Sequence, residues 1–96
     1  NDLASAKLNI VFDYIASNFQ HSISLDKLAE LANMSKTAFC RFFKARTTKT
    51  FLEYLTDMRI SYACELLIEG DLSISQISTK CGFNSPSFFN FLFRIV

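Results

Sequence analysis

The sequence predicts an all-α fold in which two helix-turn-helix subdomains are joined by a long linker helix. Glycine occurs twice and proline once in 96 residues, too rarely for an all-β fold with many turns. Apolar residues recur at helical spacing along the chain. A unit of two short helices with a turn between them also occurs twice, which suggests two homeodomain-like units of three helices.

Helix caps and apolar stripes define the elements of the first subdomain, residues 1–49. An apolar stripe predicts the first helix over about residues 5–18. Ser24 is predicted as the N-cap of a short second helix, and Ser35 as the N-cap of a third. The third helix is expected to turn three aromatic rings toward the core, those of Phe39, Phe42 and Phe43.

The linker helix is expected over residues 50–69. A capping box of Thr50 and Glu53 opens it, and Gly70 suits its left-handed end. At 1.5 Å per residue the helix is roughly 30 Å long, close to the roughly 34 Å between successive major-groove segments of DNA. Its buried stripe is expected to contain Phe51, Tyr54, Leu55, Met58, Tyr62, Leu66 and Leu67.

The second subdomain, residues 70–96, repeats the pattern of the first. A Ser-x-x-Gln capping box at residues 73–76 opens a short helix that ends at Gly82, and the Ser-Pro pair at residues 85–86 suits the start of a last helix. With an offset of 49, the matched pairs are Leu25/Ile74, Leu28/Ile77, Ala29/Ser78, Ala32/Cys81 and Met34/Phe83. After one extra turn residue, Asn84, the offset is 50 and the matched pairs are Ser35/Ser85, Thr37/Ser87, Phe39/Phe89, Phe43/Phe93 and Lys44/Arg94. The alternative is that any two small helical hairpins would agree as well.

Charge is distributed unevenly, although the net charge is only +1. The segment from Lys36 to Lys49 holds five of the ten cations and no carboxylate, whereas Thr50 to Asp71 holds five carboxylates and one Arg. A cationic helix that follows a short helix and a turn suits insertion beside DNA phosphates. The alternative is an ordinary solvated helix face.

On the third helix, the residues opposite the aromatic rings are expected to face DNA. Arg41 suits a bidentate contact to guanine, and Thr37 and Cys40 are short enough to approach base edges. The residues expected to contact phosphate are Lys36, Lys44, Arg46, Lys49 and, on the last helix, Arg94.

The last helix is expected to turn outward Pro86, Ser87, Asn90, Phe91 and Arg94. Asn90 suits adenine, and Ser87 suits either a base or a phosphate. Phe91 either packs on a thymine methyl group or is a displaced core residue.

The sequence offers little support for other classes of function. The three cysteines, Cys40, Cys64 and Cys81, form no Cys-x-x-Cys pair, so we expect reduced thiols in the cytoplasm, with no disulfide framework and no metal site. Cys64 and Cys81 are expected as small core residues. His21 lies in a polar connector without a catalytic partner. We therefore expect no enzyme, no cofactor and, because no apolar run approaches about 18 residues, no membrane span.

Five stretches point to one family. They are residues 24–35, Phe42-Phe43-Lys44, residues 51–55 with Arg59 and Ala63, Glu65-Leu66-Leu67, and residues 72–77 leading to Cys81-Gly82-Phe83. Together they resemble the DNA-binding domain of the AraC/XylS family of bacterial transcription regulators, over nearly the whole chain. The resemblance implies two helix-turn-helix subdomains that read adjacent major-groove segments, with the base-reading positions Thr37, Cys40, Arg41, Pro86, Ser87, Asn90 and Phe91.

The chain departs from this family in two ways. The family usually has Arg at the position of Phe91, and it continues beyond Val96 through a turn and a final helix. The Phe-rich end, residues 88–93, is then under-covered, and the alternative function is a helical module for protein interaction or self-association. The start at Asn1 without Met is similar to a C-terminal piece of a longer regulator.

The predicted function is sequence-specific binding of double-stranded promoter DNA by a bacterial transcription regulator. RNA polymerase and a second copy of the chain are further candidate partners. A small-molecule effector would bind an N-terminal domain that is absent from this sequence.

Overall fold

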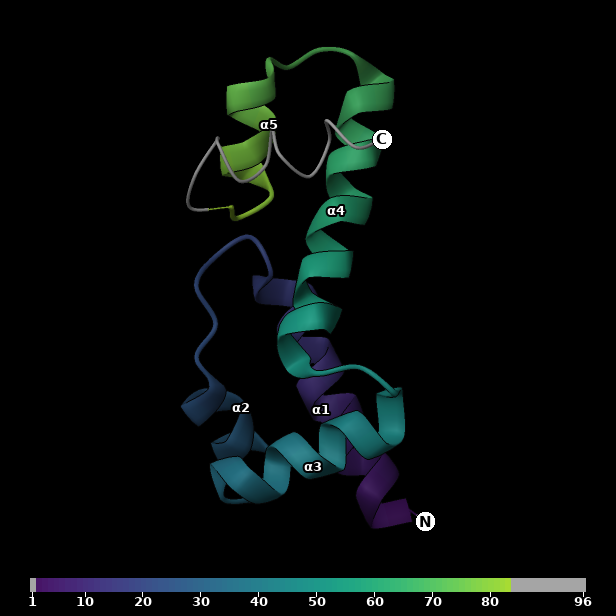
Figure 1. Ribbon diagram of the computed structural model, residues 1–96, viewed down its shortest axis with the longest axis vertical. Helices are drawn as coiled ribbons and strands as arrows, with labels where there is room; N and C mark the ends of the chain where they lie inside the picture. Colours follow the sequence, from purple (N-terminus) through teal and green to yellow (C-terminus); the bar gives the residue numbers. More distant parts are fainter. Residues whose placement is uncertain (1, 84–96) are drawn as a thin grey trace.

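The structure is a computed structural model that describes residues 2–83 of the 96. Over this range it forms five helices and no strand, so the predicted all-α class is confirmed (Figure 1). The helices in chain order are α1 (Asp2–Asn18), α2 (Leu25–Leu31), α3 (Lys36–Thr47), α4 (Phe51–Glu69) and α5 (Ile74–Lys80). Only α1 differs clearly from its predicted bounds. It begins about one turn earlier, where the strong helix former Leu3 is 67% exposed and extends the helix without joining the core.

Local side-chain bonds fix where α2 to α5 begin. The hydroxyl of Ser24 accepts a hydrogen bond from the amide of Lys27, and the hydroxyl of Ser35 accepts one from the amide of Ala38, both at 3.1 Å. Both predicted capping boxes are present, at residues 50–53 and at residues 73–76. These bonds satisfy amides that no helical carbonyl can reach, which is why the predicted starts are confirmed.

The N-terminal core lies between α1, α2, α3 and the first turns of α4. Its fully or almost fully buried residues are Val11, Ile15, Leu28, Ala29, Ala32, Phe39, Phe43 and Leu55. Phe43 meets two further rings edge-on, those of Phe12 at 6.1 Å and Tyr54 at 5.5 Å between centroids. Phe42, which was expected in the core, is only half-buried, because it lies at the side of α3 beneath the guanidinium of Arg46.

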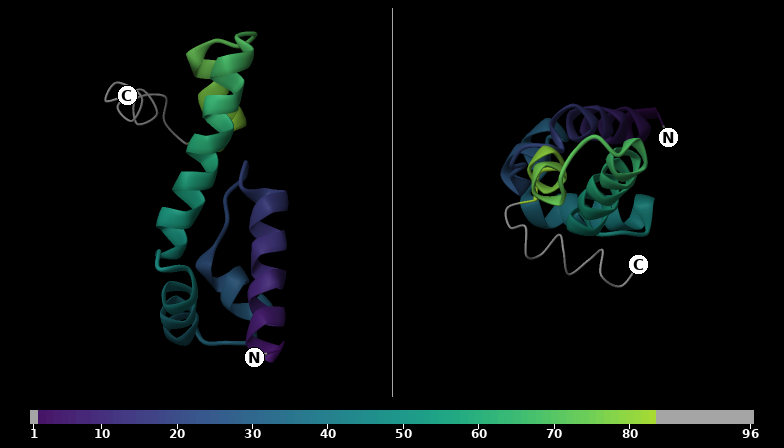
Figure 2. Two further views of the ribbon diagram at one scale, coloured as in Figure 1. Left: turned by 90° about the vertical axis from the view of Figure 1, so that its right-hand side faces the viewer. Right: turned by 90° about the horizontal axis from the view of Figure 1, so that it is seen from above.

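The C-terminal core lies between α5 and the last turns of α4, at the other end of α4 from α3 (Figures 1 and 2). Its buried residues are Ala63, Leu66, Ile77 and Cys81. The expectation that Cys64 is a core residue is wrong: its side chain is exposed. Leu67, expected in the buried stripe, is 37% exposed. Successive residues of a helix are rotated by about 100°. Because Ala63 and Leu66 face this core, the residues that follow them, Cys64 and Leu67, point away from it.

The internal repeat is visible in the backbone of the two turns. In the first, the amides of Asn33 and Met34 donate to the carbonyls of Glu30 at 3.0 Å and Ala29 at 2.9 Å. The amides of Gly82 and Phe83, 49 residues on, donate to the carbonyls of Thr79 and Ser78, both at 3.1 Å. Asn33 and Gly82 both have positive φ, 56° and 88°. The offset of 49 is thus confirmed through Phe83, and the offset of 50 falls on residues outside the described range.

The proposed boundaries at residues 1–49, 50–69 and 70–96 remain a prediction. α4 does contribute side chains to both cores. The last helix of the second subdomain is expected within residues 84–96, which the structure does not describe.

Candidate nucleic-acid interface

The third helix, α3, presents a polar face to solvent because two aromatic rings fix its rotation. Phe39 and Phe43, one turn apart, are completely buried. The opposite face carries exposed side chains, those of Lys36, Thr37, Cys40, Arg41 and Lys44. The structure therefore brings together on one surface the three predicted base-reading residues of the first subdomain and two of the predicted phosphate contacts.

The positive charge at the C-terminal end of α3 is electrostatically favourable. Lys44 and Arg46 occupy its last turn, where the negative end of the helix dipole stabilises cations. The guanidinium of Arg46 also lies 5.7 Å from the centre of the Phe42 ring, which holds it at the edge of the polar face.

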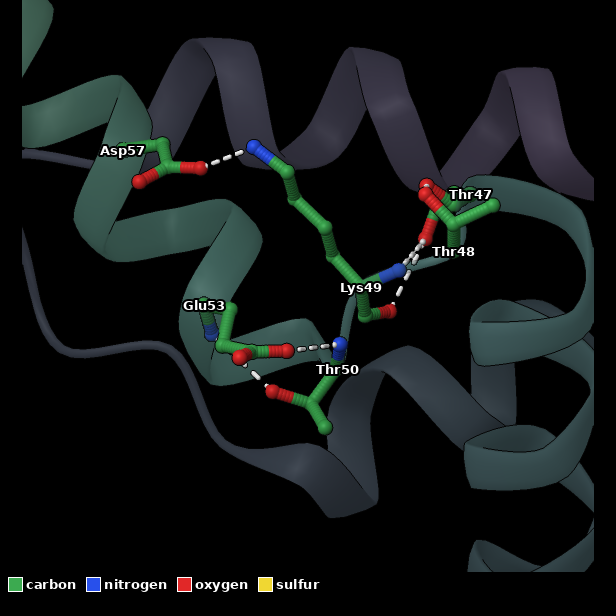
Figure 3. Close-up of polar contacts among 6 residues, drawn as sticks. All are labelled: Thr47, Thr48, Lys49, Thr50, Glu53 and Asp57. Atoms are coloured by element: carbon green, nitrogen blue, oxygen red, sulfur yellow. Dashed lines mark hydrogen bonds and ion pairs between the residues drawn. The ribbon is translucent and has the colours of Figure 1, made fainter.

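Two of the predicted phosphate contacts are already paired with carboxylates. The Lys36 ammonium lies 3.2 Å from a carboxylate oxygen of Asp26 on α2. The Lys49 ammonium donates to the carboxylate of Asp57 on α4, and this bond raises the pKa of Lys49 (Figure 3). Arg41, in contrast, makes no ion pair within residues 2–83.

The connector between α3 and α4 is held by its own polar side chains (Figure 3). Thr48, the C-cap of α3, has φ 64° and donates its amide to the carbonyl of Lys44 at 2.9 Å. The amide of Thr50 donates to the Glu53 carboxylate at 2.8 Å, and this bond, followed by the Thr50 hydroxyl beside the same carboxylate, lowers the pKa of Glu53. The capping box therefore fixes the start of α4 close to the cationic end of α3.

The predicted contacts of the second subdomain lie beyond residue 83. Those residues are Pro86, Ser87, Asn90, Phe91 and Arg94, and all lie outside residues 2–83. The described interface is therefore the polar face of α3 with its flanking cations.

Sequence reasoning gave no structural role to Arg59. This side chain lies away from α3 and donates to the carbonyl oxygens of Phe19, at 2.7 Å, and His21, at 2.9 Å. A signal was present: Arg59 is the single cation between Thr50 and Asp71. An isolated cation on an acidic helix suggests a specific acceptor elsewhere in the fold.

Other chemistry has no visible site in the described part of the chain. Cys40 and Cys64 are exposed, whereas burial raises the pKa of the Cys81 thiol to about 11. Within residues 2–83 we find no cluster of three or more His, Cys, Asp or Glu side chains placed to hold a metal ion. None of the described helices is both long enough and apolar enough to span a membrane.

Comparison with known proteins identifies the family. A family model described as a helix-turn-helix domain matches residues 28–96. The regulator YdeC of Bacillus subtilis is 30% identical over 91% of this chain, and the transcriptional activator RhaS of Escherichia coli (strain SE11) is 29% identical over 95% of it. The chain belongs to the AraC/XylS family of helix-turn-helix DNA-binding domains. It spans 30% of the length of YdeC and 33% of that of RhaS.

Solved structures of similar proteins share this fold. The DNA-binding domain of the transcriptional factor AdpA, solved in complex with a target DNA, has a TM-score of 0.80 and 29% identity, covering 88% of this chain and 77% of that one. The C-terminal domain of the response regulator YesN from Fusobacterium nucleatum has a TM-score of 0.83 over 91% of both chains. Its identity of 23% supports the fold alone.

Proposed function

We propose that this chain binds double-stranded promoter DNA in a sequence-specific manner, as the DNA-binding part of a transcription regulator. The observation that carries the proposal is the polar face of α3, which the buried rings of Phe39 and Phe43 turn to solvent. The family membership and the AdpA–DNA complex support it. In this proposal α3 enters one major-groove segment, and the helix expected within residues 84–96 enters the next.

Within this interface, each residue has a proposed role. Arg41, which has no carboxylate partner in the described range, reads guanine, and Thr37 and Cys40 approach neighbouring base edges. The proposed phosphate contacts on or near α3 are Lys36, Lys44, Arg46 and Lys49. For the second subdomain, we propose base contacts from Pro86, Ser87, Asn90 and Phe91 and a phosphate contact from Arg94.

Lys36 and Lys49 would exchange their carboxylate partners for phosphate on binding. Both ion pairs are solvent-exposed, with about half or more of each side chain accessible. Such pairs contribute little to stability, so the exchange costs little.

The test is fluorescence anisotropy with duplexes selected from a random-sequence pool, measured over a range of salt concentrations. Lys44→Ala should weaken binding to all sequences. It should also reduce the slope of the logarithm of the binding constant against the logarithm of salt concentration by about one, because one phosphate contact is lost. Arg41→Ala should relax specificity at one base position, at a cost of about 1–3 kcal/mol. No binding by the unmodified chain at low salt would refute the proposal.

Larger assemblies also belong to the proposal. Because the chain spans about a third of RhaS, we propose that a small-molecule effector binds a separate N-terminal domain of the intact regulator. RNA polymerase is the proposed further partner on the promoter. The alternative of a self-association module relies on residues 88–93, outside the described range.

A further inference from the structure

The only described side-chain hydrogen bonds between residues more than eight positions apart are those of Arg59. This residue lies on α4 between the N-terminal and C-terminal cores, and its Nε and Nη2 groups donate to the carbonyls of Phe19 and His21. These carbonyls follow α1, where the negative end of the helix dipole favours a cation. One turn along α4, the ring of Tyr62 meets the ring of Phe19 edge-on at 5.4 Å. The end of α1 is therefore fixed against the middle of α4.

The turn after α5 reaches the same place. A Cβ atom on Gly82 would lie 2.7 Å from the carbonyl oxygen of Phe19 and 3.0 Å from Nε of Arg59. The second of these neighbours is a side chain, but the first is backbone that cannot yield easily. Gly82 therefore lets the turn of the second unit contact the backbone at the end of α1 directly, with the Arg59 side chain beside this contact.

This contact sets how the two units are arranged. α4 alone fixes their separation, because it contributes to both cores. A single helix does not restrain how the α5 unit tilts about its own end of that helix. The contact of Gly82 with Phe19 and Arg59 adds a second attachment beside α4, and two attachments restrain tilt as well as distance.

We propose that Arg59 is a positioning residue that sets the spacing between the two DNA segments that this chain accepts. The proposal depends on the proposed function, in which both units bind one duplex. Each added base pair moves the second segment by about 3.4 Å and rotates it by about 34°. A rigidly joined pair of units cannot contact both DNA segments after such a change and binds more weakly. A loosely joined pair can readjust and keeps its affinity.

The binding test uses the 96-residue chain and the best duplex selected by it from a random pool, with one base pair added or removed between the two contacted segments. The unmodified chain should bind the altered duplexes at least about tenfold more weakly, because one of its two units then loses its contacts with the bases. Arg59→Lys keeps the charge but loses the planar pair of donors, and should reduce this penalty to about threefold or less. Ser61→Ala, an exposed change two residues along α4, should leave the penalty unchanged.

The outcomes separate the two proposals. If the unmodified chain binds no duplex, the proposed function is refuted and this inference fails with it. If the unmodified chain discriminates spacing and Arg59→Lys discriminates equally well, only the positioning role is refuted. A parallel loss of affinity on all three duplexes would likewise show a merely structural role for Arg59.

A second measurement needs no DNA. Spin labels are attached to the exposed Cys40 and to an introduced Lys80→Cys, with Cys64 replaced by Ser so that it takes no label. The distribution of distances between the labels should be narrow in this background and clearly broader when Arg59→Lys or Gly82→Ala is added. An unchanged width in both variants overturns the positioning role.

Discussion

Replacing Ser78 with alanine should stabilise the chain. Ser78 lies in α5 with 1% of its surface exposed, and its hydroxyl has no hydrogen-bond partner among residues 2–83. A buried polar group without a partner costs about 1–3 kcal/mol. The residue that matches it in the first unit is Ala29, which is also buried. The substitution removes only the hydroxyl, so it leaves a small apolar side chain of the kind that the fold already accepts at this position.

We expect Ser78→Ala to raise the free energy of unfolding by about 1–2 kcal/mol, after the small gain in helix propensity is subtracted. In a domain of this size, each 1 kcal/mol raises the melting temperature by about 4–8 °C. Urea and thermal unfolding followed by circular dichroism at 222 nm would measure both quantities.

Two matched variants complete this test. Ser75→Ala, an exposed change on the same helix, reports the propensity gain alone. Ala29→Ser introduces the buried hydroxyl into the first unit and should destabilise the chain by a similar 1–3 kcal/mol. If Ser78→Ala were no more stable than Ser75→Ala, the hydroxyl would have a partner in solution and the reasoning would be wrong.

Three further predictions follow from the core, the capping box and the thiols. Phe39→Ala should lower the free energy of unfolding by about 3–5 kcal/mol in urea titrations, because it empties the centre of the N-terminal core. The pKa of Glu53 is lowered in the folded chain. Glu53 therefore adds to the free energy of unfolding above its unfolded-state pKa, and this stabilisation is lost as the pH falls through the folded-state pKa. Glu53→Gln should therefore flatten the loss of stability below about pH 4.3, and an unchanged acid profile would contradict this. A maleimide should modify Cys40 and Cys64 but not the buried Cys81, and bound DNA should protect Cys40 alone. Mass spectrometry of the labelled peptides would measure the modification of each cysteine. Protection of Cys64 would instead place the DNA on α4.

The features that the sequence predicted well depend on neighbours a few residues apart. The hydroxyl of Ser35 and the amide that it caps are three residues apart, and the two capping boxes have the same span. The rotation of α3 follows from Phe39 and Phe43, four residues apart. Interactions of this range leave a periodic pattern in the sequence, so the helix starts and the exposed face of α3 could be predicted.

The features that were missed depend on distant partners. Arg59 bonds to carbonyls 38 and 40 residues away, and carbonyls leave no trace in side-chain composition. Cys64 was misplaced because α4 packs on two cores in succession, which makes its apolar stripe broader than the face it buries. The pairing of Lys49 with Asp57 crosses from a connector into a helix, so helical spacing alone could not predict it.

The crowding around Gly82 also bears on how a duplicated unit can diverge. Two copies of one turn begin with the same tolerance for replacement, and by itself the left-handed conformation admits Asn at position 33. Once the second copy packs against the end of α1, a Cβ there would meet the carbonyl oxygen of Phe19 at 2.7 Å. The two turns keep the same backbone bonds, yet they no longer accept the same residues. A chimera that carries the Ala-Asn-Met turn of the first unit in place of Cys81-Gly82-Phe83 would reproduce the local conformation and still not fit. The two units are therefore related by sequence but not interchangeable. The second unit could be replaced by that of a related protein only if the end of α1, on which its turn packs, were replaced with it.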